Sequence, residues 1–584
     1  MSNFDIWDAA VLITILIISA SIGIYYRYTG GKQKTTKEYL MANQSMSVFP
    51  VSFSLMASFM SAITLLGVSN ESYQFGIMFC VINLAYVIST PIAAYLFLPV
   101  FYRMRTTSVY EYLERRFGHA TRLVASLAYS VQMILYMGIV LYAPALALEA
   151  VTGIHKNTAI LAIGFVCTFY STIGGMKAVL ITDVFQSILM FAAIYSVIVV
   201  SALKAEGGLG AIWNVAVERG RMEINEFSLD PTVRHTFWSL IIGGIVTYLS
   251  LYGVNQTQVQ RLLSVRDLKG AQAALWWNLP ILSTLSFSTL FSGLAIFYYY
   301  RNCDPVLEGR IKYRDQIMPL FAIDTMGQYP GLCGLFVSGI FSGSLSSISS
   351  AVSSLAAVTL EDYLKPLYKV CFRRPMTDSN TTLPSKIIAC LYGIVCVGLA
   401  FGAGSLGGVL QASLTIFGIV GGPLLALFTL GMCTTRSNQR GALLGLLIGL
   451  MFSFWIGFGG PKPPPPSLPL SVDNCTAAIN TTINATLSII TTTPKPPVVE
   501  YFWLYKLSYL WFSVIGFIIT LVVGYACSVW LELLNLADNT QIYLNAARKQ
   551  VDYDLFVPPL SRKLREAAVE ELTKLNSYEA RLVQ

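Results

Sequence analysis

Apolar residues in this chain come in long blocks, separated by short polar and basic stretches. A helix needs roughly 20 apolar residues to cross a hydrocarbon layer about 30 Å thick, and about 13 blocks reach that length. The pattern therefore predicts an all-α polytopic membrane protein with about 13 transmembrane helices. The blocks cover residues 6–26, 48–70, 76–101, 122–151, 157–175, 180–203, 236–255, 274–300, 331–357, 385–404, 408–432, 440–459 and 505–530.

Basic side chains indicate which loops face the cytoplasm. Lysine and arginine follow the first, third, seventh and ninth blocks, and Arg261 is counted in the loop after the seventh. Short cytoplasmic loops carry such an excess, so these loops are predicted to lie inside and the N-terminus outside. With an odd number of spans, the tail from residue 531 is cytoplasmic.

The loop 460–504 is rich in proline and threonine and is extracellular by this charge count. Sequences that accept N-linked glycans in such a segment indicate exposure outside the cell. We therefore expect glycosylation of this loop at Asn474, Asn480 and Asn484.

Composition agrees with a membrane protein and excludes several other classes. Hydrophobic residues make up 55% of the 584 residues and charged residues 12%, against about 25% charged residues in soluble domains. The net charge of +8 includes no basic run of the kind that binds nucleic acid. The ten cysteines and three histidines have no metal-ligand spacing, and the blocks contain no nucleophile–base pair or phosphate loop, which argues against an enzyme. Cys303 can pair with Cys475 or with Cys333, and no spacing rule chooses between them.

Two blocks contain features that favour an interrupted helix. The second, 48–70, carries serines and a threonine through its middle, and the seventh, 236–255, contains Gly243, Gly244 and Gly253. In transporters built from inverted repeats, the first helix of each repeat is discontinuous near the membrane midplane. The two blocks occupy those positions if the first helix is set aside. The alternative is that small residues merely let helices pack closely.

The ninth block combines glycine with many serines. Gly343, Ser346 and Ser347 are spaced i, i+3 and i+4, so they share one helical face. Uncharged oxygen ligands of this kind suit an alkali cation. Alternatively, the serines bond to the carbonyls of their own helix.

Asp183 lies in the first turn of the sixth block, and an ionisable residue within a membrane helix is a functional candidate. It is placed to attract a departing Na⁺ or to hold a nearby cation such as Lys177. The alternative is a capping aspartate at a helix start.

Several stretches together resemble the solute:sodium symporter family, over residues 8–530. Within that family the chain is most similar to the branch of sodium-coupled monocarboxylate, multivitamin and iodide transporters. The resemblance implies a leucine-transporter-type fold of two inverted five-helix repeats with extra flanking helices. The matching stretches are 57–62, 66–68, 142–148, 174–179, 182–186, 255–261, 356–362 and 408–411.

The resemblance also implies roles for individual residues. The backbone carbonyls of Ala57, Met60 and Gly343 and the hydroxyls of Ser346 and Ser347 would bind Na⁺, and Asp183 would lie at the inner sodium exit. Thr64 stands where the iodide transporter has glutamine, which disfavours iodide and leaves a second ion site open. The expected substrate cavity consists of Thr64, Tyr142, Gln186, Gln411 and Phe417.

These interpretations divide the chain and assign it a function. We expect a plasma-membrane symporter that imports a small organic solute with Na⁺ by alternating access, its substrate a monocarboxylate or carboxylated vitamin. The alternatives are an iodide-like anion transporter and a sodium-gated channel or solute sensor of the same fold. The expected parts are 1–47 (N-terminus, leading helix and first cytoplasmic loop), 48–203 (first repeat), 204–235 (extracellular loop), 236–432 (second repeat), 433–530 (two flanking helices with the loop 460–504) and 531–584 (cytoplasmic tail).

Overall fold

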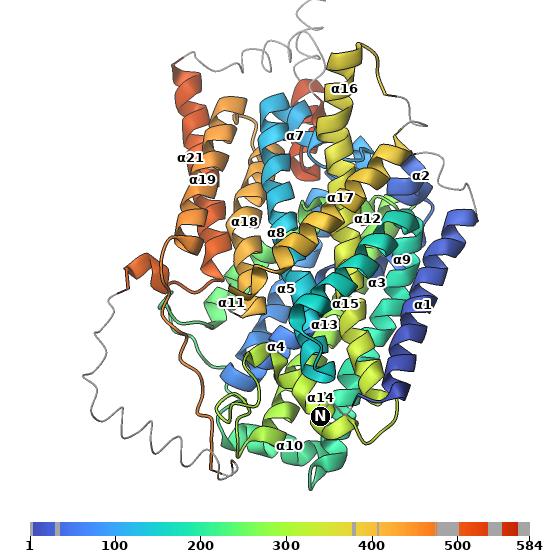
Figure 1. Ribbon diagram of the computed structural model, residues 1–584. Coiled ribbons are helices and arrows are strands. Elements are labelled where there is room, and N and C mark those ends of the chain that lie inside the picture. Colours follow the sequence, from blue (N-terminus) through green and yellow to red (C-terminus); the bar gives the residue numbers. More distant parts are fainter. Residues whose placement is uncertain are drawn as a thin grey trace, which may run out of the picture.

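A bundle of long helices makes up the computed structural model (Figure 1). It describes residues 4–29, 36–376, 381–405, 408–473, 475, 501–534 and 552–569. Within them the only β-type pairing is an isolated bridge between Met46 and Val265. The α-helices are α1 (Ile6–Tyr28), α2 (Thr36–Met41), α3 (Val48–Phe59), α4 (Ala62–Phe75), α5 (Ile82–Ile92), α6 (Leu98–Met104), α7 (Glu111–Arg116), α8 (His119–Thr152), α9 (Lys156–Lys204), α10 (Gly208–Glu218), α11 (Phe237–Tyr248), α12 (Gln256–Leu262), α13 (Leu268–Tyr300), α14 (Ile317–Met326), α15 (Leu332–Val358), α16 (Lys365–Phe372), α17 (Thr382–Ala400), α18 (Val409–Cys433), α19 (Gln439–Phe458) and α21 (Trp511–Leu533). Short 3₁₀ and π segments are η1 (Ala42–Gln44), η2 (Ile77–Val81), η3 (Ala93–Phe97), η4 (Leu249–Gly253), η5 (Arg314–Gln316), η6 (Thr359–Leu364), η8 (Ala403–Ser405), η9 (Trp503–Lys506) and η10 (Tyr553–Leu555).

The membrane spans agree with the apolar blocks in position. Among the described residues, 10 helices are long and apolar enough to cross a membrane, or up to 12 if each bent pair counts as one span. The block at 157–175 corresponds to the shorter apolar helix Lys156–Phe169. It forms the first part of α9, which kinks at Gly175 with φ 63°, a value that costs glycine little. The polytopic helical fold is thus confirmed, and the count of 13 stays a prediction.

The second block is interrupted, as expected. α3 and α4 meet at 60° because Met60 and Ser61 are extended rather than helical. The hydroxyl oxygen of Ser61 accepts a hydrogen bond from the amide of Ile63 at 3.1 Å and so starts α4 as its N-cap. A break of this kind leaves the last carbonyls of α3 without partners in their own helix.

The seventh block is interrupted in the same way. The helix from Phe237 to Gly253 meets α12 at 56°. Asn255 caps α12, its side-chain oxygen accepting from the amide of Thr257 at 2.9 Å. The broken helix therefore continues to Leu262, beyond the expected end of the block at residue 255.

The two ends of the bundle carry different short helices (Figure 1). α2, α7 and α16 lie at one end, called here the α16 end; α10, α14 and the N-terminus lie at the other, the α10 end. Large apolar side chains such as Phe165, Ile17 and Leu391 point outward from the helices between these ends, with 72%, 59% and 56% of their surfaces exposed. Such an apolar exterior suits contact with lipid.

α18, α19 and α21 pack through small residues. A Cβ added to Gly422 of α18 would lie 2.1 Å from the carbonyl oxygen of Ser513 in α21, and one added to Gly445 of α19 would lie 2.6 Å from that of Thr520. Real Cβ atoms cannot approach this closely, so glycine permits the contact. These close approaches form what we call the glycine seam.

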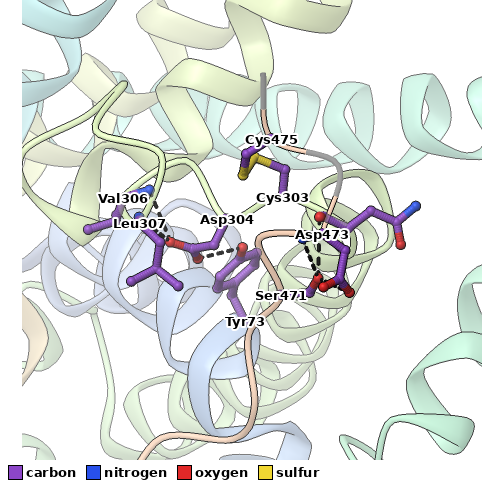
Figure 2. Close-up of a disulfide and its surroundings, with 9 residues drawn as sticks. Tyr73, Cys303, Asp304, Val306, Leu307, Ser471, Asp473 and Cys475 are labelled. Carbon is purple, nitrogen blue, oxygen red and sulfur yellow. Dashed lines mark hydrogen bonds between the residues drawn. A yellow bond between two sulfur atoms is a disulfide. The ribbon is translucent and has the colours of Figure 1, made fainter. Parts of the chain in front are cut away.

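At the α10 end, a disulfide joins Cys303 to Cys475, which are 172 residues apart in sequence (Figure 2). Cys333, the competing partner, is free and buried. The carboxylate of Asp304 accepts a hydrogen bond from the hydroxyl of Tyr73 at 2.9 Å. Tyr73 belongs to α4, so the disulfide loop contacts the second half of the first broken helix.

A segment of the C-terminal tail packs against the bundle. Phe556 is buried, with its ring 5.3 Å from the guanidinium of Arg116, and the amide of Val557 donates to the carbonyl of Met432 at 3.1 Å. Residues 558–569 of this tail are helical.

Candidate functional site

The first break brings together residues that were expected to bind Na⁺. Ala57 is in the last turn of α3, where carbonyls lack helical partners, and its carbonyl oxygen accepts from the hydroxyl of Ser347 on α15 at 3.4 Å. Gly343, one turn earlier on α15, packs directly against the break: an added Cβ would lie 2.8 Å from the amide nitrogen of Ala62. Met60 is the extended residue at the break itself. The donor set consists of neutral oxygens and is buried, which fits an alkali cation.

Ser346 contacts a buried carboxylate instead of the break. Its hydroxyl donates to Oδ1 of Asp183 at 2.6 Å, and the hydroxyl of Ser54 on α3 donates to the other oxygen of this carboxylate. A hydroxyl retains lone pairs while it donates. Ser346 can therefore link an ion at the break to Asp183, which has no exposed surface.

The partner of Asp183 is Arg261, not Lys177. A guanidinium nitrogen of Arg261 lies 3.8 Å from Oδ2 of Asp183, and its Nε donates to the hydroxyl of Ser54 at 2.9 Å. The ammonium of Lys177 lies 5.7 Å from the ring of Tyr26 instead. Placing Arg261 in a cytoplasmic loop was wrong, because the broken helix continues past Asn255 and buries this side chain completely. Asn255, a helix-capping residue, could have indicated from the sequence that a new helix starts here and continues past the block.

A small cavity of about 40 Å³ adjoins the break. Thr64 lines it together with Phe59 of α3 and Tyr248 of α11. Phe417 packs against Phe59, with the ring centres 6.5 Å apart. Because ligand pockets usually measure about 300–1,000 Å³, this central cavity must widen to accept a solute.

The other expected cavity residues lie elsewhere. Tyr142 and Gln411 line a second cavity of about 360 Å³ closer to the α10 end, called here the middle cavity. Leu410 lines both the middle and the central cavity. Gln186 lines neither; it is fully buried on α9, and neither of its side-chain polar atoms has a hydrogen-bond partner among the described residues.

An ion pair not expected from the sequence lies beside the middle cavity. The guanidinium of Arg234 donates to both carboxylate oxygens of Glu71 on α4, at 2.6 and 3.0 Å, and to the side-chain oxygen of Gln411 on α18 at 2.8 Å. Burial of Arg234 lowers its pKa, but the adjacent carboxylate of Glu71 raises it by more, so the pKa of Arg234 lies above its usual value. Burial lowers the pKa of the neighbouring His235 to about 4, so this imidazole is neutral near pH 7.

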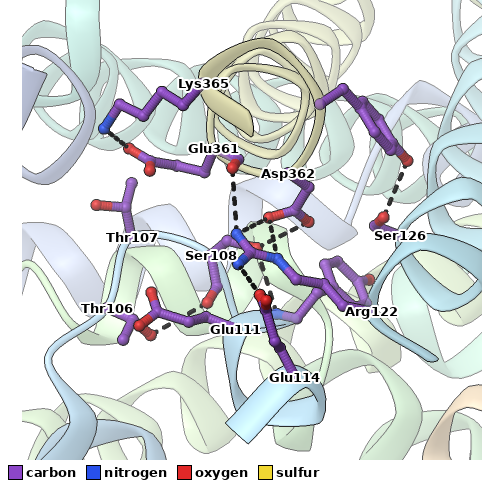
Figure 3. Close-up of polar contacts among 12 residues, drawn as sticks. Thr106, Thr107, Ser108, Glu111, Glu114, Arg122, Ser126, Glu361, Asp362 and Lys365 are labelled. Carbon is purple, nitrogen blue, oxygen red and sulfur yellow. Dashed lines mark hydrogen bonds and ion pairs between the residues drawn. The ribbon is translucent and has the colours of Figure 1, made fainter. Parts of the chain in front are cut away.

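A second polar cluster lies at the α16 end (Figure 3). Arg122 of α8 donates to Asp362 of η6 at 2.9 Å and also pairs with Glu114 of α7. The hydroxyl of Ser108 donates to the second oxygen of Asp362 at 3.1 Å. The break between α3 and α4 and the central cavity thus lie between two sets of ion pairs. The expected glycosylation sites Asn474, Asn480 and Asn484 lie outside the described residues.

Residues 39–449 match the profile of the "Sodium:solute symporter family". A Drosophila melanogaster protein named "Putative sodium-dependent multivitamin transporter" is 59% identical over 97% of this chain and 93% of its own length. Human "Sodium-coupled monocarboxylate transporter 1" is 43% identical over 91% of this chain and 88% of its own length. Rabbit (Oryctolagus cuniculus) "Sodium-dependent multivitamin transporter" is 42% identical, with coverages of 90% and 83%.

One solved structure shares the fold over most of its length. It is the substrate-bound outward-open state of a Na⁺-coupled sialic acid symporter, with a TM-score of 0.74 and 23% sequence identity. The match covers 90% of this chain and 98% of that one. The expected symporter fold with two broken helices is therefore confirmed.

Proposed function

We propose that this chain, which belongs to the sodium:solute symporter family, imports a short monocarboxylate or a carboxylated vitamin together with Na⁺. The chain is a transporter rather than an enzyme, and Na⁺ is its coupling ion. The names of its relatives supply the two substrate classes. A carboxylate is the feature we take to be common to both.

The observation that carries the proposal is the meeting of the Ala57 carbonyl, Gly343 and Ser347 at the break between α3 and α4. In our proposal Na⁺ binds there to neutral oxygens and draws the two halves of the broken helix toward α15. An ion that favours the same conformation as the solute raises the affinity for the solute, and the effect is reciprocal. The membrane potential drives Na⁺ inward and contributes about 2.3 kcal/mol per charge per 100 mV to transport.

The proposed inward route of Na⁺ passes Asp183. Ser346 contacts this carboxylate and stands next to Ser347 in sequence, so an ion leaving the break meets a negative charge. Arg261 supports that charge from the far side. We propose that Asp183 receives the ion before its release at the α16 end.

We further propose that the α10 end is extracellular and that the protein resides in the plasma membrane. Disulfides persist in oxidising compartments, and the Cys303–Cys475 bond lies at the α10 end. The basic residues Lys365, Lys369 and Arg373 belong to or follow α16, at the other end. Both features support the same orientation.

The test is uptake of labelled lactate, butyrate, nicotinate, biotin and pantothenate, with iodide, by cells that express the chain. Each solute is measured in Na⁺ and in choline. We expect concentrative, Na⁺-dependent uptake of at least one carboxylate. Ser347→Ala should raise the Na⁺ concentration for half-maximal uptake several-fold, because it removes one oxygen ligand at the break.

Ser353→Ala is the matched control. Ser353 is partly buried on the same helix, seven residues from Ser346, and should leave uptake unchanged. Surface labelling of each variant must show equal expression. Surface-expressed protein without accumulation of any carboxylate would refute the substrate assignment, and Na⁺ currents without accumulation would favour a channel.

A further inference from the structure

A cavity of about 350 Å³ lies beside Arg234 and is lined by Lys462 and Tyr505 of the segments that follow α19. We call it the outer cavity. Its volume falls within the usual range for ligand pockets of about 300–1,000 Å³. Arg234, Lys462 and Lys506 line it, and no aspartate or glutamate does among the described residues. A cavity with three cationic side chains and no carboxylate attracts anions.

Two cations of this cavity, Lys462 and Lys506, have no ion-pair partner among the described residues, and Lys462 is the more buried of the two. Lys462 is partly buried, and its ammonium lies 4.3 Å from the ring centre of Phe512. No aspartate or glutamate of the described part of the chain forms an ion pair with it. Burial lowers its pKa to about 8. An anion in the cavity would supply the missing charge.

Arg234 connects the outer cavity to the middle cavity. It lines both, as does Gln411. Its guanidinium is held by Glu71, which lines only the middle cavity of the two. A carboxylate has the same bidentate geometry as the Glu71 side chain, so it can take the place of Glu71 on Arg234 without a change in the guanidinium.

The remaining wall of the outer cavity suits the apolar part of a carboxylated solute. Tyr501, Tyr505 and Tyr509 line it together with a run of prolines at 463–466. Aromatic rings offer large apolar surfaces with a polar edge. Small-molecule sites commonly combine such walls with a few charged groups that fix orientation.

We infer that the outer cavity is a carboxylate-binding site on the path of the solute: Lys462 binds the carboxylate first, and Arg234 receives it when Glu71 is displaced. This inference rests on the proposed function only for the identity of the occupant. Binding at the outer cavity involves no residue of the ion-binding break and so should not require Na⁺. Release of Glu71 would also free α4 from Arg234. Arrival of the solute would in this way be coupled to movement of the broken helix.

The experiment measures the accessibility of Lys462 in the purified full-length protein at pH 8 without Na⁺. Brief acetylation followed by peptide mass spectrometry gives the modification rate of each lysine. Nicotinate and biotin are the probes, and nicotinamide and biotin amide are their uncharged counterparts. Chloride at the same ionic strength tests whether any small anion protects Lys462 from acetylation. Lys204, an exposed lysine at the end of α9, is the internal control.

We expect at least one carboxylate to slow acetylation of Lys462 in a saturable manner, with no change at Lys204 and no protection by the amides or chloride. Equal protection by an amide or by chloride, equal slowing at Lys204, or no protection by either carboxylate would overturn the inference. In cells, Lys462→Gln should raise KM for the carboxylate about three- to tenfold, whereas Lys204→Gln should not. Uptake with a normal KM in Lys462→Gln would refute the outer site and leave the proposed function intact. Protection without uptake would refute the proposed function alone.

Discussion

Gly343 illustrates how one residue without a side chain can determine the geometry of the proposed ion site. It lies where α15 crosses the break, 2.8 Å from the amide nitrogen of Ala62 if a Cβ is added. Ser61 forms the other side of the contact at 3.1 Å. Any larger residue must push α15 away from the carbonyls of α3, and this separation would disassemble the proposed ligand set.

We therefore expect Gly343→Ala to weaken Na⁺ binding more than the addition of a single methyl group would suggest. Overpacking costs about 1–3 kcal/mol, which corresponds to a rise of roughly five- to 150-fold in the Na⁺ concentration for half-maximal uptake. The matched control is Gly398→Ala on α17, where an added Cβ meets nothing within 4 Å. Equal effects of the two substitutions on Na⁺ dependence would contradict the assignment of the site.

Four elements meet at the Asp183 carboxylate. α9 carries the carboxylate, α3 and α15 donate hydroxyls from Ser54 and Ser346, and α12 contributes Arg261. α3 and α12 are halves of the two broken helices, so this buried cluster connects both. A pair of this kind is costly to break on one side, because the remaining charge stays buried.

We expect Arg261→Met and Asp183→Leu each to lower the free energy of unfolding by about 3–5 kcal/mol. The double variant should be more stable than either single variant, because it leaves no unpaired charge. Thermal unfolding of the purified proteins, followed by tryptophan fluorescence, provides the measurement. Additive losses in the double variant would show that the two groups do not stabilise each other.

At the scale of the whole molecule, the disulfide joins the loop after α13 to a segment that follows α19. Asp304, next to Cys303, accepts from Tyr73 of α4. The amide of Leu468 in the same segment donates to the carbonyl of Gln74 at 3.0 Å. The covalent link therefore stabilises the surroundings of α4, the helix half that we propose moves during transport.

Removal of the disulfide should lower stability and loosen α4. Closing a long loop contributes about 2–5 kcal/mol, so Cys303→Ser/Cys475→Ser should unfold at a lower temperature. The single variants should match the double variant, because each removes the same bond. Cys333→Ser is the control and should unfold as the wild type does. A free thiol at Cys475 in the native protein, found by mass mapping without reduction, would contradict the pairing.

Local sequence signals predicted the helices and both breaks, because the serines and glycines that favour an interruption lie within the interrupted segments themselves. Such local signals cannot predict contacts between segments that lie far apart in the sequence. Arg261 follows a break and resembles a loop cation; only the packing of α12 against α3 and α15 places it beside Asp183. The outer cavity combines residues near 234, 411, 462 and 505, and nothing in their separate neighbourhoods indicates that they meet. The choice between Cys475 and Cys333 was likewise a matter of three-dimensional position.

The glycine seam has a consequence for motion. Backbones in contact at Gly422 and Gly445 leave no room for α18, α19 and α21 to slide past one another. When the transporter changes state, these three helices should turn as one rigid body, and lipid should not penetrate between them. Spin labels on α19 and α21 would then keep a single separation throughout the cycle, while a label on α18 would change its distance from one on α15.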